Sequence, residues 1–83
     1  MKFIELPESE RDELTKLFLF RTSSDKILST LMRVSRELPG YNSPQEIFEM
    51  TKNYLVENKF KLNENIKQFE KTARWDKLED DEK

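Results

Sequence analysis

The chain's only glycine and two of its three prolines lie in one short segment, Leu38-Pro39-Gly40-Tyr41-Asn42-Ser43-Pro44. The ring of Pro39 disfavours the helical conformation at Leu38, and Gly40 can adopt a positive φ angle without steric cost. A helix that arrives from the N-terminal side must therefore end here. Together with the apolar spacing on either side, this segment predicts two helices, 24–38 and 44–58, joined by a turn.

The helix at 44–58 has a specific signal at its first residues. The Ser43 hydroxyl can accept a hydrogen bond from the backbone N–H of Glu46, while the Glu46 carboxylate can accept one from the Ser43 N–H. Pro44 suits the first helical position, because an N–H there would have no partner within the helix. The sequence Ser43-Pro44-Gln45-Glu46 therefore predicts a capping box. The functional alternative is a recognition turn that displays Tyr41.

Apolar side chains recur at helical spacing in both helices and predict one shared core. In 24–38 they are Ile27, Leu28, Leu31, Val34 and Leu38. In 44–58 the core-facing residues are Ile47, Phe48, Thr51, Tyr54 and Leu55, with Met50 beside them. The opposite side of 24–38 carries Lys26, Arg33 and Arg36. These could contact phosphate or carboxylate groups, although three basic residues are also typical of a solvated helix face.

Polar segments flank the two helices and predict where they begin and end. Thr22-Ser23-Ser24-Asp25 supplies an N-cap for 24–38. At the far end of 44–58, Asn58-Lys59 can stop the helix, since asparagine tolerates the left-handed conformation of a C-cap. The next residues, Phe60-Lys61-Leu62, are expected to be extended, with their apolar side chains filling the bundle. Pairing of this linker with residues 2–4 would give a small two-stranded ribbon.

The N-terminal part predicts an extended arm followed by a helix. Residues 1–6 could lie on the core as the arm or form an edge strand. Pro7 then opens a helix at 8–20, whose first turns hold Glu8, Glu10, Asp12 and Glu13, since carboxylates favour the positive end of a helix dipole. Leu14, Leu17 and Phe18 share one face, but Leu19 and Phe20 do not. Either this end is buried on several sides, or part of it contacts a partner.

The C-terminal part predicts a fourth helix, 63–76, capped by Asn63 and facing inward with Leu62, Ile66, Phe69 and Ala73. Lys67, Lys71 and Arg74 form a basic ridge beside Trp75, which lies about 180° from the apolar stripe. This is the most partner-like grouping in the sequence. The alternative is that the helix frays near Arg74 and Trp75 folds back on the core. The acidic run that follows predicts a disordered tail at 79–83.

Composition excludes several classes of function. The chain has no cysteine and no histidine, so it lacks a disulfide framework, the usual zinc ligands and an imidazole base. No metal, cofactor or enzymatic activity is expected. No apolar run approaches the roughly 20 residues of a membrane-spanning helix, and the charged N-terminus differs from a signal peptide. We therefore expect a cytoplasmic protein. The net charge of −2 disfavours nucleic-acid binding.

These patterns predict an all-α fold: a compact antiparallel four-helix bundle in a single domain, residues 1–78, followed by the acidic tail. The apolar spacing from Lys26 to Glu70 resembles that of small bacteriocin-immunity helical bundles and, equally, that of death-fold-type adaptor domains of bacterial defence systems. The resemblance lies in spacing and matches no functional residues. It implies a helical bundle.

By elimination, the sequence predicts a protein-binding module: an adaptor, an inhibitor or an immunity-type protein. Its contact surface would be the outer side of helices 8–20 and 63–76, which could also mediate self-association. Aromatic residues and arginine are enriched where interface energy concentrates, and the candidate contact residues are Leu19, Phe20, Lys67, Lys71, Arg74 and Trp75. The alternative is a small nucleic-acid-binding regulator that uses the basic face of 24–38 or of 63–76.

Overall fold

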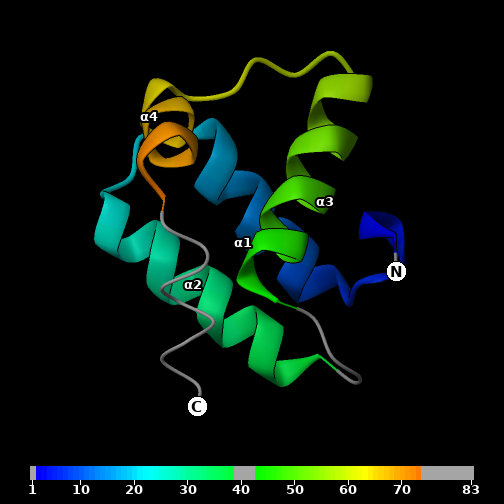
Figure 1. Cartoon of the computed structure of the whole chain (residues 1–83). Coiled ribbons are helices and arrows are strands. Elements are labelled where there is room, and N and C mark those ends of the chain that lie inside the picture. Colours follow the sequence, from blue (N-terminus) through cyan, green and yellow to red (C-terminus); the bar gives the residue numbers. More distant parts are fainter. Residues whose placement is uncertain (1, 39–42, 74–83) are drawn as a thin grey trace.

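Four α-helices build the protein, as the computed structural model shows for residues 2–38 and 43–73. A one-turn 3-10 helix, η1 (Phe3–Glu5), precedes α1 (Glu8–Leu19), α2 (Ser24–Glu37), α3 (Pro44–Glu57) and α4 (Glu64–Thr72). In Figure 1, α3 stands beside α1, and α2 runs beneath both. The fourth helix, α4, lies on the other side of α1 from α3. The predicted all-α, four-helix bundle is confirmed, and the described residues contain no strand.

Side-chain caps define the start of three helices. The Ser23 hydroxyl accepts from the Lys26 N–H at 3.3 Å, and the Ser43 hydroxyl accepts from the Glu46 N–H at 3.2 Å. Asn63 Oδ1 accepts from the N–H of Asn65 at 2.8 Å. Each bond satisfies a backbone donor that has no partner inside its helix. The predicted N-caps of α2, α3 and α4 are therefore confirmed. Of the capping box predicted at α3, the bond to the Ser43 hydroxyl is present, whereas the reciprocal bond from the Ser43 N–H to the Glu46 carboxylate is not found among the described residues.

The end of α3 has a two-bond cap at a different residue from the one predicted. Lys59 has a positive φ of 66°, whereas Asn58 remains at φ −92°. The Phe60 N–H donates to the Leu55 carbonyl at 2.9 Å, and the Lys59 N–H donates to the Val56 carbonyl at 3.0 Å. This Schellman pattern requires the left-handed residue one position after the C-cap. The Asn58 side chain instead donates to the Tyr54 carbonyl at 2.7 Å.

The core lies where α1, α2 and α3 meet, with α4 packed against α2. The Phe18 and Phe48 ring centroids are 5.0 Å apart, and those of Phe48 and Phe69 are 5.8 Å apart. These separations are typical of paired aromatic side chains. The completely buried aliphatic residues come from all four helices: Leu14, Ile27, Leu31, Val34, Ile47, Leu55 and Ile66. The predicted apolar stripes therefore face the core.

Residues 2–6 form a turn rather than the predicted extended arm. The Leu6 N–H donates to the Phe3 carbonyl at 3.1 Å, and both side chains are buried. In an extended segment, residues three apart would point to opposite faces, whereas a 3-10 turn places them on the same side. The Phe3 ring stacks on Tyr54 of α3 with a centroid distance of 4.6 Å. Burial of two apolar side chains therefore selects the turn.

Two expectations for the C-terminal part are corrected. Phe60, predicted to fill the bundle, is about half exposed, because the Schellman turn leads the chain outward; Leu62 packs against the core. The fourth helix ends at Thr72 rather than at 76, since Ala73 has extended backbone angles, φ −64° and ψ 137°. Arg74, Trp75 and the acidic tail lie outside the described residues.

None of the helices in the described part of the chain combines the length and the apolar character needed to cross a membrane.

Candidate functional site

The two apolar residues predicted as contacts at the end of α1 differ in exposure. Leu19 is half-buried and packs against the core. Phe20 follows as the C-cap, with extended backbone angles, φ −107° and ψ 152°. Its side chain is 63% exposed, although Phe18 two positions earlier is completely buried. The end of α1 is thus packed on most sides, and Phe20 is the apolar group that it leaves available.

The end of α1 lies beside the start of α4. The backbone N–H of Asn63 donates to the Phe18 carbonyl at 2.9 Å, which has no partner inside its own helix. The Asn65 side-chain amide donates to the Thr22 carbonyl at 2.6 Å. These two bonds join the start of α4 to the last turn of α1 and to the loop that connects α1 with α2.

The two described lysines of the basic ridge lie on a different side of α4 from this loop. Lys67 and Lys71 are exposed, and Lys67 is 3.6 Å from the Glu64 carboxylate. Glu70, three positions after Lys67, forms an ion pair with Lys52 of α3. Residues three or four apart share a helix face, so Lys67 lies on the side of α4 toward α3. The predicted contact surface is therefore divided: Lys67 lies on that side, whereas Phe20 borders the hollow between α1 and α2.

A groove between α1 and α2 adjoins Phe20. Its volume is about 290 Å³, and its lining residues are Glu13, Lys16, Leu17, Phe20, Thr22, Lys26 and Thr30. The buried side chains of Leu17 and Thr30 contribute to this lining, while Lys16 and Lys26 are exposed. An aromatic side chain and two cations thus border one hollow. Sequence periodicity identified Phe20, but not these neighbours.

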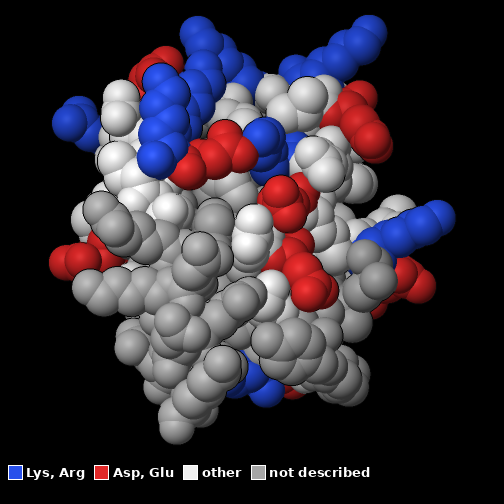
Figure 2. Space-filling view, viewed as in Figure 1, with Lys and Arg blue, Asp and Glu red and all other residues white. Residues whose placement is uncertain are grey.

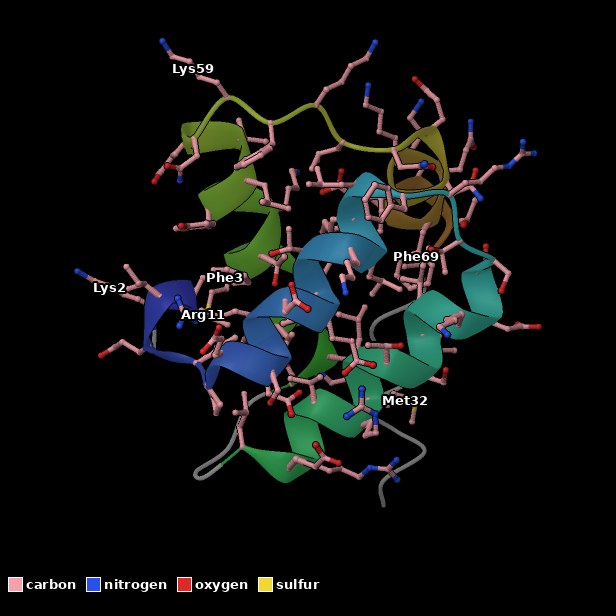
Figure 3. All side chains as sticks on the ribbon, turned by 180° about the vertical axis from the view of Figure 1, so that it is seen from behind. Lys2, Phe3, Arg11, Met32, Lys59 and Phe69 are labelled. Carbon is pink, nitrogen blue, oxygen red and sulfur yellow. The ribbon has the colours of Figure 1, made fainter. Side chains whose placement is uncertain are left out.

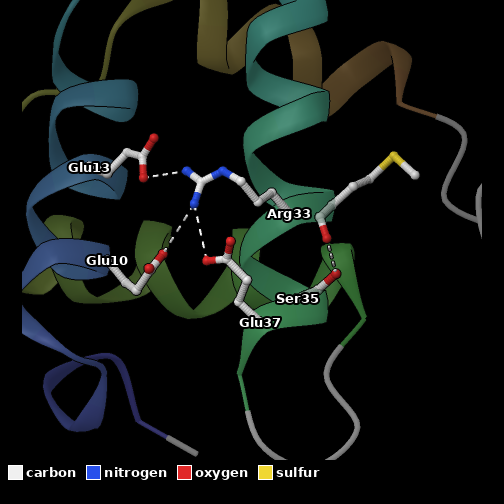
Figure 4. A network of polar contacts seen from close by, with 6 residues as sticks. Glu10, Glu13, Arg33, Ser35 and Glu37 are labelled. Carbon is white, nitrogen blue, oxygen red and sulfur yellow. Dashed lines mark hydrogen bonds and ion pairs between the residues drawn. The ribbon is translucent and has the colours of Figure 1, made fainter.

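Figure 4 shows Arg33 of α2 reaching three glutamates. Its guanidinium forms an ion pair with Glu13, and it lies 3.9 Å from Glu10 and 3.2 Å from Glu37. The hydrogen bond with Glu13 raises the pKa of Arg33. Arg33 was predicted on a solvated basic face; it instead joins α1 to α2, because α1 places its acidic first turns opposite this position.

Glu10, which belongs to the same cluster, has a raised pKa. Burial and the nearby Glu37 carboxylate raise its pKa, although the positive charge of Arg33 acts in the opposite direction. One Glu10 oxygen, Oε2, is buried and has no hydrogen-bond partner among the described residues. Glu13 differs, because its carboxylate is bonded directly to Arg33. The carboxylate of Glu13 beside the groove is therefore already engaged in an ion pair.

A second hollowed surface surrounds the Phe3–Tyr54 stack and was not identified from sequence. One groove of about 330 Å³ includes Phe60, and another of about 440 Å³ includes Ile4 and Met50. Figure 3 shows Phe3 between η1 and α3, where these grooves meet. The available signal was weak: Ile4 and Phe60 are apolar residues outside the helical stripes, and both are substantially exposed.

Within the described residues, no three acidic, histidine or cysteine side chains are grouped so that they could hold a metal ion. The described surface presents exposed apolar side chains and exposed lysines. No protein-family model, curated protein or solved structure matches the chain.

Proposed function

We propose that this chain is a small, non-enzymatic protein-binding module, acting as an adaptor, an inhibitor or an immunity-type protein. Its contact surface would be the α1–α2 groove together with the Phe20 side chain. The observation that supports this proposal is the exposure of Phe20 beside a hollow with buried apolar lining. Aromatic side chains that enter a partner's pocket commonly supply much of the binding energy of an interface.

The energetic argument depends on what Phe20 does in the free protein. Full burial of a phenylalanine side chain is worth about 1.5–3 kcal/mol, and Phe20 at 63% exposure obtains only part of that gain within the fold. A partner that covers the side chain would supply the remainder. Leu19 would contribute little additional area, since it already packs against the core. Arg74 and Trp75 remain proposed contacts outside the described residues.

The proposal is tested by Phe20→Ala with Val56→Ala as a matched control. Val56 is also an exposed apolar residue, 52% exposed, but it lies on α3. Pull-down from host lysate, followed by affinity measurement with the recovered partner, should show binding weakened roughly tenfold or more by Phe20→Ala, equivalent to about 1.4 kcal/mol. Val56→Ala should leave binding nearly unchanged.

Denaturant melts of the same variants separate binding from folding. Phe20→Ala should cost little stability, whereas loss of a buried phenylalanine costs about 3–5 kcal/mol. A large stability loss, or equal partner binding by both variants, would refute the proposal. Sedimentation of the wild type and of Phe20→Ala determines whether the partner is a second copy of the chain.

A second candidate function is nucleic-acid binding through the lysines of α4 and the preceding linker. Figure 2 shows Lys and Arg side chains gathered along the upper edge of the molecule, where α4 and this linker lie in Figure 1. Lys59, Lys61, Lys67 and Lys71 are all exposed. The basic face of α2 is weaker support, because Arg33 is engaged by glutamates.

Binding of labelled duplex and single-stranded DNA at two salt concentrations tests this candidate, because phosphate contacts lose affinity steeply as salt rises. Lys67→Glu combined with Lys71→Glu should abolish such binding. Retention of DNA binding by this double variant would exclude the α4 surface as its site.

A further inference from the structure

We infer that the segment bound in the α1–α2 groove is acidic, with an apolar side chain flanked by carboxylates. This inference rests on the protein-binding function proposed above and specifies the chemistry of the partner. The groove combines one exposed aromatic edge, a buried apolar lining and two lysines, of which Lys26 has no ion pair among the described residues.

The two lysines at the groove differ in whether they already have an ion-pair partner. Lys26 lines the groove and forms no ion pair within the described part of the chain. Lys16 pairs with Asp12 at 3.1 Å, but both side chains are 64% exposed, and an exposed pair of this spacing contributes only about 0.3–0.5 kcal/mol. A carboxylate of a partner can therefore replace Asp12 at little cost.

The acidic side chain in the groove lining already has an ion-pair partner. Glu13 is the acidic residue in the lining, and it forms an ion pair with Arg33. A partner segment would thus meet Lys16 and Lys26. A basic partner would be repelled, and a neutral one would leave these cations unused.

The apolar part of the groove determines how the segment binds. Leu17 and Thr30 are buried in its lining, and the largely exposed ring of Phe20 forms one edge. A volume of about 290 Å³ lies near the lower limit of small-ligand clefts, roughly 300–1,000 Å³. It accommodates one or two side chains rather than an extended interface. The expected occupant is therefore a short peptide segment with a central aromatic or aliphatic anchor.

The probe is a displayed library of random peptides, selected on the wild-type protein and counter-selected on Phe20→Ala. We expect enriched peptides to carry an apolar residue with Asp or Glu on either side. Their affinity should fall roughly tenfold or more, about 1.4 kcal/mol, for Phe20→Ala and for the double variant Lys16→Glu, Lys26→Glu. The matched control, Lys59→Glu with Lys61→Glu, makes the same charge change on the linker and should leave affinity within about twofold, less than about 0.5 kcal/mol.

The outcomes separate the two proposals. Peptides that require Phe20 but are neutral or basic, or that bind equally well to the Lys16, Lys26 variant, would overturn the acidic-partner inference and leave the binding surface intact. Failure to enrich any peptide that depends on Phe20 would overturn both proposals. An oligonucleotide probe that binds through Lys16 and Lys26 without any effect of Phe20→Ala would assign the groove to nucleic acid and overturn the inference. Denaturant melts of each variant confirm that it is folded.

Discussion

Replacing Glu10 with glutamine is expected to stabilise this protein at pH 7, although it removes one carboxylate from the Arg33 cluster. The Glu10 side chain is only 15% exposed and lies 3.9 Å from the guanidinium, and no donor in the part of the chain that the structure describes bonds to its buried Oε2. Burial and Glu37 raise the pKa of Glu10 above its ordinary value of 4.5, although Arg33 acts in the opposite direction. At this position, burial and repulsion from Glu37 therefore destabilise the charged form of Glu10 by more than attraction to Arg33 stabilises it.

The sign of the pH dependence follows from that shift. A raised pKa means that the folded protein binds a proton at Glu10 more tightly than the unfolded chain does. The resulting stabilisation is complete below about pH 4.5 and is lost as the pH rises through the folded-state pKa. At pH 7, a buried unsatisfied oxygen costs about 1–3 kcal/mol, and more when it is charged. Glutamine keeps a polar atom at this position but removes the charge, whereas the partly exposed ion pair that is lost contributes about 0–1 kcal/mol. We therefore expect Glu10→Gln to raise the unfolding free energy by about 1 kcal/mol.

Denaturant melts followed by far-UV circular dichroism, at pH 7 and at about pH 3.5, measure this effect. At the lower pH the Glu10 carboxyl is protonated, so the variant and the wild type should have nearly equal stability. Glu13→Gln is the matched control, because its carboxylate is 42% exposed and bonded to Arg33. It should lose about 0.5–1 kcal/mol at pH 7. A Glu10→Gln variant that is less stable at pH 7 would refute the reasoning and show that the ion pair outweighs burial.

Two further predictions concern the ends of α3. Ser43→Ala should lower the unfolding free energy by about 1 kcal/mol, because it removes the hydroxyl that accepts from the Glu46 N–H; superimposable denaturant melts would mean that this cap contributes nothing. Lys59→Gly should raise the thermal midpoint, with a gain of up to about 1 kcal/mol, because Lys59 has φ 66° and glycine adopts this conformation without a Cβ penalty. A lower midpoint would show that the lysine side chain stabilises the turn by more than its backbone costs.

Local chemistry in the sequence was sufficient to place the helices. Ser23, Ser43 and Asn63 cap helices near the predicted residues, because a capping bond joins atoms only two or three residues apart. The apolar stripes were also predictable, since helical periodicity determines which residues share a face. The fourth helix was less predictable at its end, because neither glycine nor proline follows Thr72 to mark it.

The candidate site was only partly predictable, because helical phase gives the direction of a side chain but not what covers it. Helical phase placed Phe20 off the core-facing stripe, and the structure leaves it exposed. The same phase placed Leu19 off the stripe, but Leu19 packs against the core. The two residues are adjacent in sequence, and their exposure differs because neighbouring elements cover Leu19 but not Phe20.

The tertiary structure alone determined which side chains meet between helices. Arg33 and Glu13 are 20 positions apart, yet they form an ion pair because α1 and α2 pack side by side. The groove brings Lys16 and Lys26 beside Phe20 for the same reason. Periodicity specifies the direction of a side chain around its own helix axis, but contacts between helices also depend on their packing angle and axial offset. Those two quantities come from how the buried side chains of all four helices fill one core.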